Sequence, residues 1–122
     1  MTKPNLLNPE FWISLRKRTS LDGWVGVEEC SYWTNEVLDL LREYRPHGFI
    51  RIEGGVSSEQ RLRHHFFVDY HRALGKRLPD GIFIADGTAG QIHDDYLLGY
   101  YGYIDDAPAR LRVFYKEMVK GF

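Results

Sequence analysis

Residues 57–78 decide the fold, because the run His64-His65-Phe66-Phe67-Val68-Asp69-Tyr70 within them fits two patterns. With a period of two, the run predicts a strand that places His65 and Asp69 on one face. With a period of 3.6, apolar residues at 62, 66, 70 and 74 predict a helix, which a Ser57…Gln60 capping box would begin. Aromatic and β-branched residues favour the strand. We therefore predict a strand over 64–70.

The flanking segments complete an α+β pattern. Asn8-Pro9-Glu10 begins a short helix, and the apolar spacing over 29–44 predicts a longer amphipathic one. Strands are predicted over 48–53 and 82–85, with a further strand or irregular segment over 96–104. A last helix carries a stripe of Leu111, Phe114, Tyr115 and Met118. Hairpin-length turns between the strands indicate an antiparallel sheet, in a single domain that spans 1–122.

Composition excludes several classes of protein. The chain has 122 residues, 43% of them hydrophobic and 15% aromatic, which is enough for one domain with a real core. A net charge of −1 gives no electrostatic reason to bind nucleic acid or an anionic membrane. The sequence shows neither a signal peptide nor a membrane span. We expect a cytoplasmic protein, or one exported without a cleaved signal.

The single cysteine is the first candidate for chemistry. It excludes an internal disulfide and fits a reducing compartment. Cys30 lies in the first turn of the predicted helix 29–44, where the helix dipole favours a thiolate, although Glu28 and Glu29 oppose it. His65, at the start of the predicted strand, is the candidate base. Asp86, at the end of the next strand, is the candidate carboxylate that orients the histidine.

A metal site was weighed on the same segment. His64, His65, Asp69 and His71 lie close together in the sequence. On a strand, however, the three residues that share a face extend over about 20 Å, and on a helix His64 and His71 share a face poorly with Asp69. Neither arrangement makes a three-ligand site, so we predict no metal and no cofactor.

Two segments resemble a known enzyme superfamily. The run from His65 to Tyr70 resembles the transglutaminase-like strand His-Ala-Trp-Val-Glu-Val. The run Ile84-Ala85-Asp86-Gly87-Thr88-Ala89-Gly90-Gln91 is similar to the Ile-Asp-x-Thr-Ala-Gly-Gln segment of bacterial papain-fold toxin and effector domains. With Cys30 ahead of both, the order is Cys…His…Asp. The resemblance implies a papain-like core, with the nucleophile helix packed on a small antiparallel sheet and extra helices at both ends.

The same resemblance assigns roles to single residues. It implies that Cys30 is the nucleophile, His65 the base and Asp86 the orienting carboxylate. His64 replaces His65 if the aromatic match shifts by one residue. Trp24 and Gln91 are further candidates for the substrate site.

The function implied is a cysteine-dependent amide hydrolase or acyl transferase that acts on a protein or peptide through a thioacyl intermediate. Deamidation, proteolysis and transglutamination share that intermediate, and the resemblance to toxin and effector domains favours a protein-modifying enzyme. The alternative is a catalytically inactive binding module of the same fold. Glu28, Glu29 and the lack of Gln or Asn over 24–29 as an oxyanion donor support it. A third hypothesis, a helical regulatory domain, requires that 57–78 form one helix.

Overall fold

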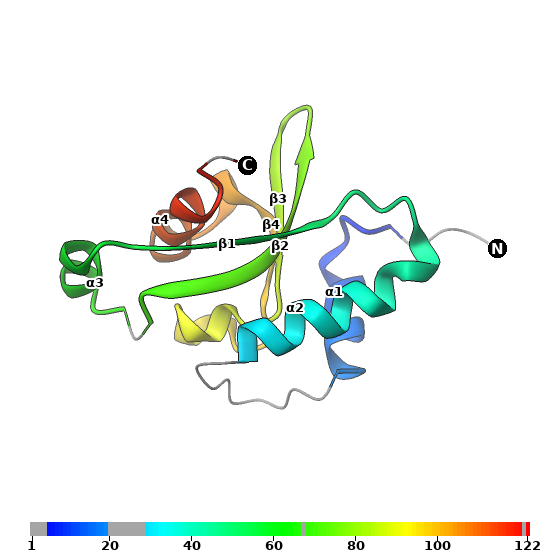
Figure 1. Cartoon of the computed structure of the whole chain (residues 1–122), viewed down its shortest axis with the longest axis horizontal. Coiled ribbons are helices and arrows are strands. Elements are labelled where there is room, and N and C mark those ends of the chain that lie inside the picture. Colours follow the sequence, from blue (N-terminus) through cyan, green and yellow to red (C-terminus); the bar gives the residue numbers. More distant parts are fainter. Residues whose placement is uncertain (1–4, 20–28, 67, 121) are drawn as a thin grey trace.

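The computed structural model describes residues 5–19, 29–66, 68–120 and 122, and in these residues the fold is mixed α+β (Figure 1). A four-stranded antiparallel sheet has the order β1-β2-β3-β4. Its strands are β1 (Ile50–Gly55), β2 (Tyr70–Leu78), β3 (Gly81–Asp86) and β4 (Tyr100–Tyr103). The α-helices are α1 (Pro9–Lys17), α2 (Glu29–Leu40), α3 (Ser58–His64) and α4 (Ala109–Met118). The α+β class and the antiparallel sheet are confirmed.

Helices cover both faces of the sheet (Figure 1). On the face of the sheet that α1 and α2 cover, buried side chains form one core cluster. Its members are Trp12, Leu15, Trp33, Val37, Leu41, Phe49, Leu74, Phe83, Ala85 and Tyr101. The α4 side is built around the predicted stripe of Leu111, Phe114, Tyr115 and Met118, which packs on Ile52, Ala73, Ile84 and Tyr100. Because side chains alternate along a strand, neighbouring residues of β2 contribute to different cores.

The helix that carries Cys30 was predicted correctly. Residues 29–40 form α2, and a 3₁₀ turn (Leu41–Tyr44) continues it to the predicted end. The N-terminal helix is also confirmed, because the Asn8 side chain accepts a hydrogen bond from the Glu10 N–H at 3.0 Å and Pro9 occupies the first turn.

The predicted strand over 64–70 is wrong. Ser57 caps α3 by accepting a hydrogen bond from the Gln60 N–H at 3.1 Å, and the helix runs to His64. His65 then adopts a left-handed conformation (φ 54°), and the Phe66 N–H bonds to the Arg61 carbonyl. The cap at each end of α3 therefore outweighs the strand propensity of the short aromatic run. The strand begins only at 70, so 57–78 is a helix followed by a strand.

The close contact between Gly87, the residue after β3, and Trp33 predicts how a substitution changes stability. Gly87 lies against the indole of Trp33, and a Cβ at Gly87 would be 2.2 Å from Trp33 Nε1. Trp33 is fully buried and cannot move aside. We expect Gly87→Ala to lower the free energy of unfolding by about 1–3 kcal/mol, measured by urea denaturation. Gly75→Ala is the control, because its nearest contact is 3.3 Å. Equal losses in both variants would contradict this packing.

Candidate active site

A buried histidine and a buried carboxylate meet where β2 and β3 separate. The two strands pair from Leu78↔Gly81 as far as Leu74↔Ala85, so Asp86, at the end of β3, comes directly after the last pair and near the N-terminal half of β2. There His71 Nε2 is 2.7 Å from Asp86 Oδ2, and neither side chain is exposed. A charged pair at this depth requires further polar contacts to offset desolvation.

Hydrogen-bond donors surround the Asp86 carboxylate. Its Oδ1 accepts from the Thr88 N–H at 3.0 Å and from the Thr88 hydroxyl at 3.2 Å. Its Oδ2 accepts from the Tyr115 hydroxyl of α4 at 2.7 Å, in addition to His71. With four donors on two oxygens, the ionised carboxylate is satisfied although it is buried. Asp86 is thus fixed in one orientation toward the histidine.

The second nitrogen of His71 faces an oxygen as well. Its Nδ1 lies 2.9 Å from Gln91 Oε1, and Gln91 closes the short 3₁₀ turn Ala89–Gln91 that follows β3. An imidazole with an acceptor at each nitrogen is best satisfied when both nitrogens carry protons. Burial lowers the pKa of His71, but attraction and hydrogen bonding to Asp86 and Cys30 raise it from 6.5 to about 10. The site therefore favours the imidazolium.

The thiol of Cys30 completes the group. Burial raises the pKa of Cys30, but hydrogen bonding and attraction to His71, with a hydrogen bond from the Arg72 backbone N–H, lower it below its ordinary value of 9.0. The nearby charge of Asp86 opposes this shift. Cys30 is the second residue of α2, where the helix dipole adds to the stabilisation of a thiolate. The arrangement supports a thiolate–imidazolium pair.

The hydrogen bond from Arg72 follows from the strand register. In the β2–β3 hairpin, Leu78 pairs directly across the turn with Gly81, so every second residue of β2 directs its N–H toward β3. Arg72 is one of these residues, but the pairing stops at Leu74↔Ala85. The N–H of Arg72 therefore points into the space where β3 has turned away, and the sulfur of Cys30 takes the acceptor position there.

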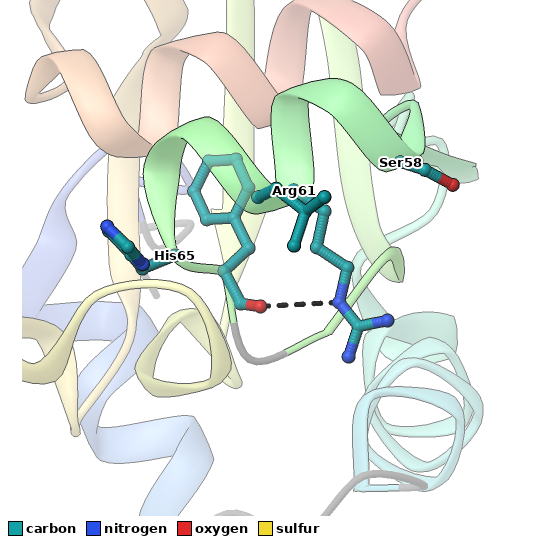
Figure 2. Close-up of a pocket in the computed structure, with 5 residues that line it drawn as sticks. Ser58, Arg61 and His65 are labelled. Carbon is teal, nitrogen blue, oxygen red and sulfur yellow. Dashed lines mark hydrogen bonds between the residues drawn. The ribbon is translucent and has the colours of Figure 1, made fainter.

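The structure brings together three of the residues singled out from the sequence, namely Cys30, Asp86 and Gln91, around a histidine that was not the predicted one. His65 ends α3, is exposed, and lines a separate surface pocket with Ser58 and Arg61, where its ring points away from Arg61 (Figure 2). The backbone carbonyls of both His64 and His65 accept hydrogen bonds from Arg110, and neither histidine is among the groups that shift the pKa of Cys30. Trp24 lies outside the described residues.

A signal for His71 was present in the sequence. The turn Leu78-Pro79-Asp80-Gly81 was recognisable, and a two-residue loop pairs residue 78 with 81. Counting outward from that pair places 71 opposite 88, and 65 opposite 94. Only His71 can then lie beside the segment that begins at Asp86. From the sequence, His71 was instead considered as a metal ligand with His64, His65 and Asp69.

The described part of the chain contains neither a metal-binding cluster nor a membrane-spanning helix. Among those residues, no group of three or more His, Cys, Asp or Glu side chains is arranged to hold a metal ion. No helix there has the length and apolar character needed to cross a membrane.

Comparison of the chain with protein-family models, with curated proteins and with solved structures finds no match. The geometry around Cys30, His71 and Asp86 is therefore the main guide to what the chain does.

Gln91 gives a first test of this geometry. Gln91→Glu would place a carboxylate beside His71 Nδ1, where it competes with the Cys30 thiolate for the same cation. We expect the pKa of Cys30 to rise and iodoacetamide to alkylate it about three- to tenfold more slowly at neutral pH, because one pKa unit is about a tenfold change in thiolate. Gln60→Glu, in the first turn of α3, is the control. Unchanged alkylation in Gln91→Glu would show that Gln91 does not influence the thiol.

Proposed function

We propose that this chain is a cysteine-dependent amide hydrolase or acyl transferase with Cys30 as nucleophile, His71 as general acid and base, and Asp86 as the residue that orients His71. One observation carries the proposal: a fully buried histidine is hydrogen-bonded to a fully buried carboxylate and also interacts with the only thiol of the chain. Nucleophile, base and orienting group in contact are the signature of activated-thiol catalysis.

The geometry supports a two-step acyl transfer. The Cys30 thiolate attacks the carbonyl carbon of an amide, and a C–S bond forms as the carbonyl oxygen takes the negative charge. His71 then donates a proton to the departing nitrogen as the C–N bond breaks. The proton comes from Nδ1, which is not bonded to Asp86 and leaves its contact with Gln91 Oε1 in this step. Neutral ammonia or an amine leaves, and a thioester of Cys30 remains.

Release reverses the proton transfer. Neutral His71 accepts a proton from water or from a second amine, whose oxygen or nitrogen attacks the thioester carbon. The C–S bond breaks, and Cys30 leaves as the thiolate beside the restored imidazolium. Water gives hydrolysis or deamidation, and an amine gives transglutamination, so the second nucleophile determines the outcome.

Chain order and placement support a papain-like core within the mixed α+β fold. The thiol begins a helix, and the histidine and the carboxylate follow on two adjacent antiparallel strands. In the segment 84–91, which resembles bacterial papain-fold toxin and effector domains, Asp86 and Gln91 are the two residues that hold His71. This favours a protein or peptide as the acyl donor.

Reaction with p-nitrophenyl acetate tests the proposal without knowledge of the natural substrate. We expect a burst of one nitrophenolate per chain and an acetyl group on Cys30 by mass spectrometry, with no burst in Cys30→Ala. Acetylation no faster than that of free cysteine would reject the enzyme and favour the inactive binding module of the same fold.

A further inference from the structure

The residues on either side of His71 in β2 lie on the opposite face of the sheet. Side chains alternate along a strand, so Tyr70 and Arg72 share the face of Leu74, which packs in the α1 and α2 core. This is the face on which α2 begins with Glu29 and Cys30. One strand thus supplies the histidine of the proposed site from one face and a cation near the thiol from the other.

Two contacts hold the Arg72 side chain in place. Its Nε donates to Glu53 Oε2 at 2.8 Å across the β1–β2 pair, and its guanidinium lies over the Tyr70 ring at 5.2 Å from the centroid. The side chain is 34% exposed. Within the part of the chain that the structure describes, neither Nη group makes a hydrogen bond. A pre-positioned, partly exposed guanidinium with unpaired Nη donors can bind a planar anion.

Electrostatics link Arg72 to the thiol. Hydrogen bonding to Glu53 is the main reason that the pKa of Arg72 is raised, and the charge of the Cys30 thiolate adds to it. Burial is the main reason that the pKa of Tyr70 is raised, Glu53 raises it further, and the thiolate makes a smaller contribution. Arg72 and Tyr70 are therefore within electrostatic range of the sulfur. Glu53 offsets part of the Arg72 charge but occupies only the Nε side of the fork.

We propose that Arg72 is a specificity residue that binds a carboxylate or a similar anionic group of the acyl donor, next to the carbonyl that Cys30 attacks. The inference rests on the proposed function and adds a substrate class to it: acyl donors with an acidic group a few bonds from the reacting carbonyl. Glu53 and Tyr70 hold the guanidinium in position, and the two Nη groups supply the hydrogen bonds.

Two alkylating reagents that differ in charge test this. Iodoacetate and iodoacetamide each form a C–S bond with Cys30 as iodide leaves with the bonding electrons, but only iodoacetate is anionic. We expect Arg72→Gln to lower the iodoacetate-to-iodoacetamide rate ratio by about two- to fivefold at moderate salt, about 0.1 M, as one charge within the Debye length of about 10 Å would. The ratio cancels any change in thiol pKa, because both reagents react with the same thiolate.

Arg77→Gln is the matched control. Arg77 lies in the same strand and also stacks on an aromatic ring, that of Phe122 at 5.1 Å, but is five residues further along. That separation is roughly 16 Å, beyond the range of an exposed charge at moderate salt. The proposal predicts an unchanged ratio in Arg77→Gln. A ratio that is the same in Arg72→Gln and the unsubstituted chain, or that falls equally in both variants, would overturn it.

The same experiment separates this inference from the proposed function. Fast, His71-dependent alkylation by iodoacetamide with no effect of Arg72→Gln on the ratio rejects the role of Arg72 and leaves the thiol enzyme standing. Slow alkylation by both reagents, insensitive to His71→Ala, rejects the thiol enzyme itself and the specificity role with it.

Discussion

Replacement of His71 by alanine should slow alkylation of Cys30 by iodoacetamide at neutral pH by about tenfold to a hundredfold. The imidazolium is the main reason that the thiol pKa lies below 9.0, and burial then raises the pKa without opposition from that cation. Acyl transfer should fall further, by roughly 10²- to 10⁴-fold, because the proton donor for the leaving group is lost. Timed alkylation with mass-spectrometric counting measures the first effect.

His65→Ala and His64→Ala are the matched controls, and both should alkylate at the unsubstituted rate. His71→Ala removes the cationic partner of buried Asp86 and should lower the free energy of unfolding. The fold should persist, because Asp86 keeps two donors from Thr88 and one from Tyr115. Circular dichroism checks this directly. Loss of reactivity in His65→Ala, with His71→Ala unaffected, would show that the site described here is not the reactive one.

The second large effect is expected for Asp86→Asn. The Thr88 N–H and hydroxyl both donate to Oδ1, so that position requires an oxygen. The new amide must then turn its NH₂ toward His71 Nε2, and this nitrogen becomes an acceptor. The proton of a neutral ring moves to Nδ1, which can no longer accept the thiol proton.

A fixed wrong tautomer of this kind costs on the order of 10⁴-fold in turnover in enzymes with a comparable triad. We therefore expect Asp86→Asn to abolish the burst with p-nitrophenyl acetate and to raise the pKa of Cys30. Asp105→Asn, an exposed residue of the turn before α4, should change neither. A normal burst in Asp86→Asn would mean that the carboxylate does not orient His71.

Local signals predicted most of the elements. Asn8-Pro9, the apolar spacing of α2, the turn at Pro79-Asp80 and the stripe of α4 each specify structure over a few residues, and each appears as expected. The segment 57–78 failed because two signals compete over the same residues. The helix caps determine its first half, and pairing with β1 and β3 determines its second half. The pairing of β2 with β1 and with β3 is not visible in a local sequence pattern.

Two of the three members of the proposed site were singled out from the sequence for the same reason. Cys30 and Asp86 follow from a helix start and a strand end, which are local features. The position of His71 follows only from the strand register. The sequence of β2 is hard to recognise as a strand, because Arg72, Lys76 and Arg77 break the alternation expected of a half-buried strand. The contact between Tyr115 and Asp86 joins segments 29 residues apart, so no sequence pattern indicates it.

The most direct test of the Cys30 thiolate–His71 imidazolium pair is the ultraviolet absorbance of the thiolate during a pH titration. The chain has a single cysteine, so Cys30→Ser supplies the blank. The thiolate–imidazolium pair predicts that the absorbance of Cys30 rises below pH 9.0, and that His71→Ala moves this transition upward. Alkylation should rise through the same transition, whereas acyl transfer should fall again as His71 loses its proton near pH 10. A single transition at or above pH 9.0, unchanged by His71→Ala, would contradict the account.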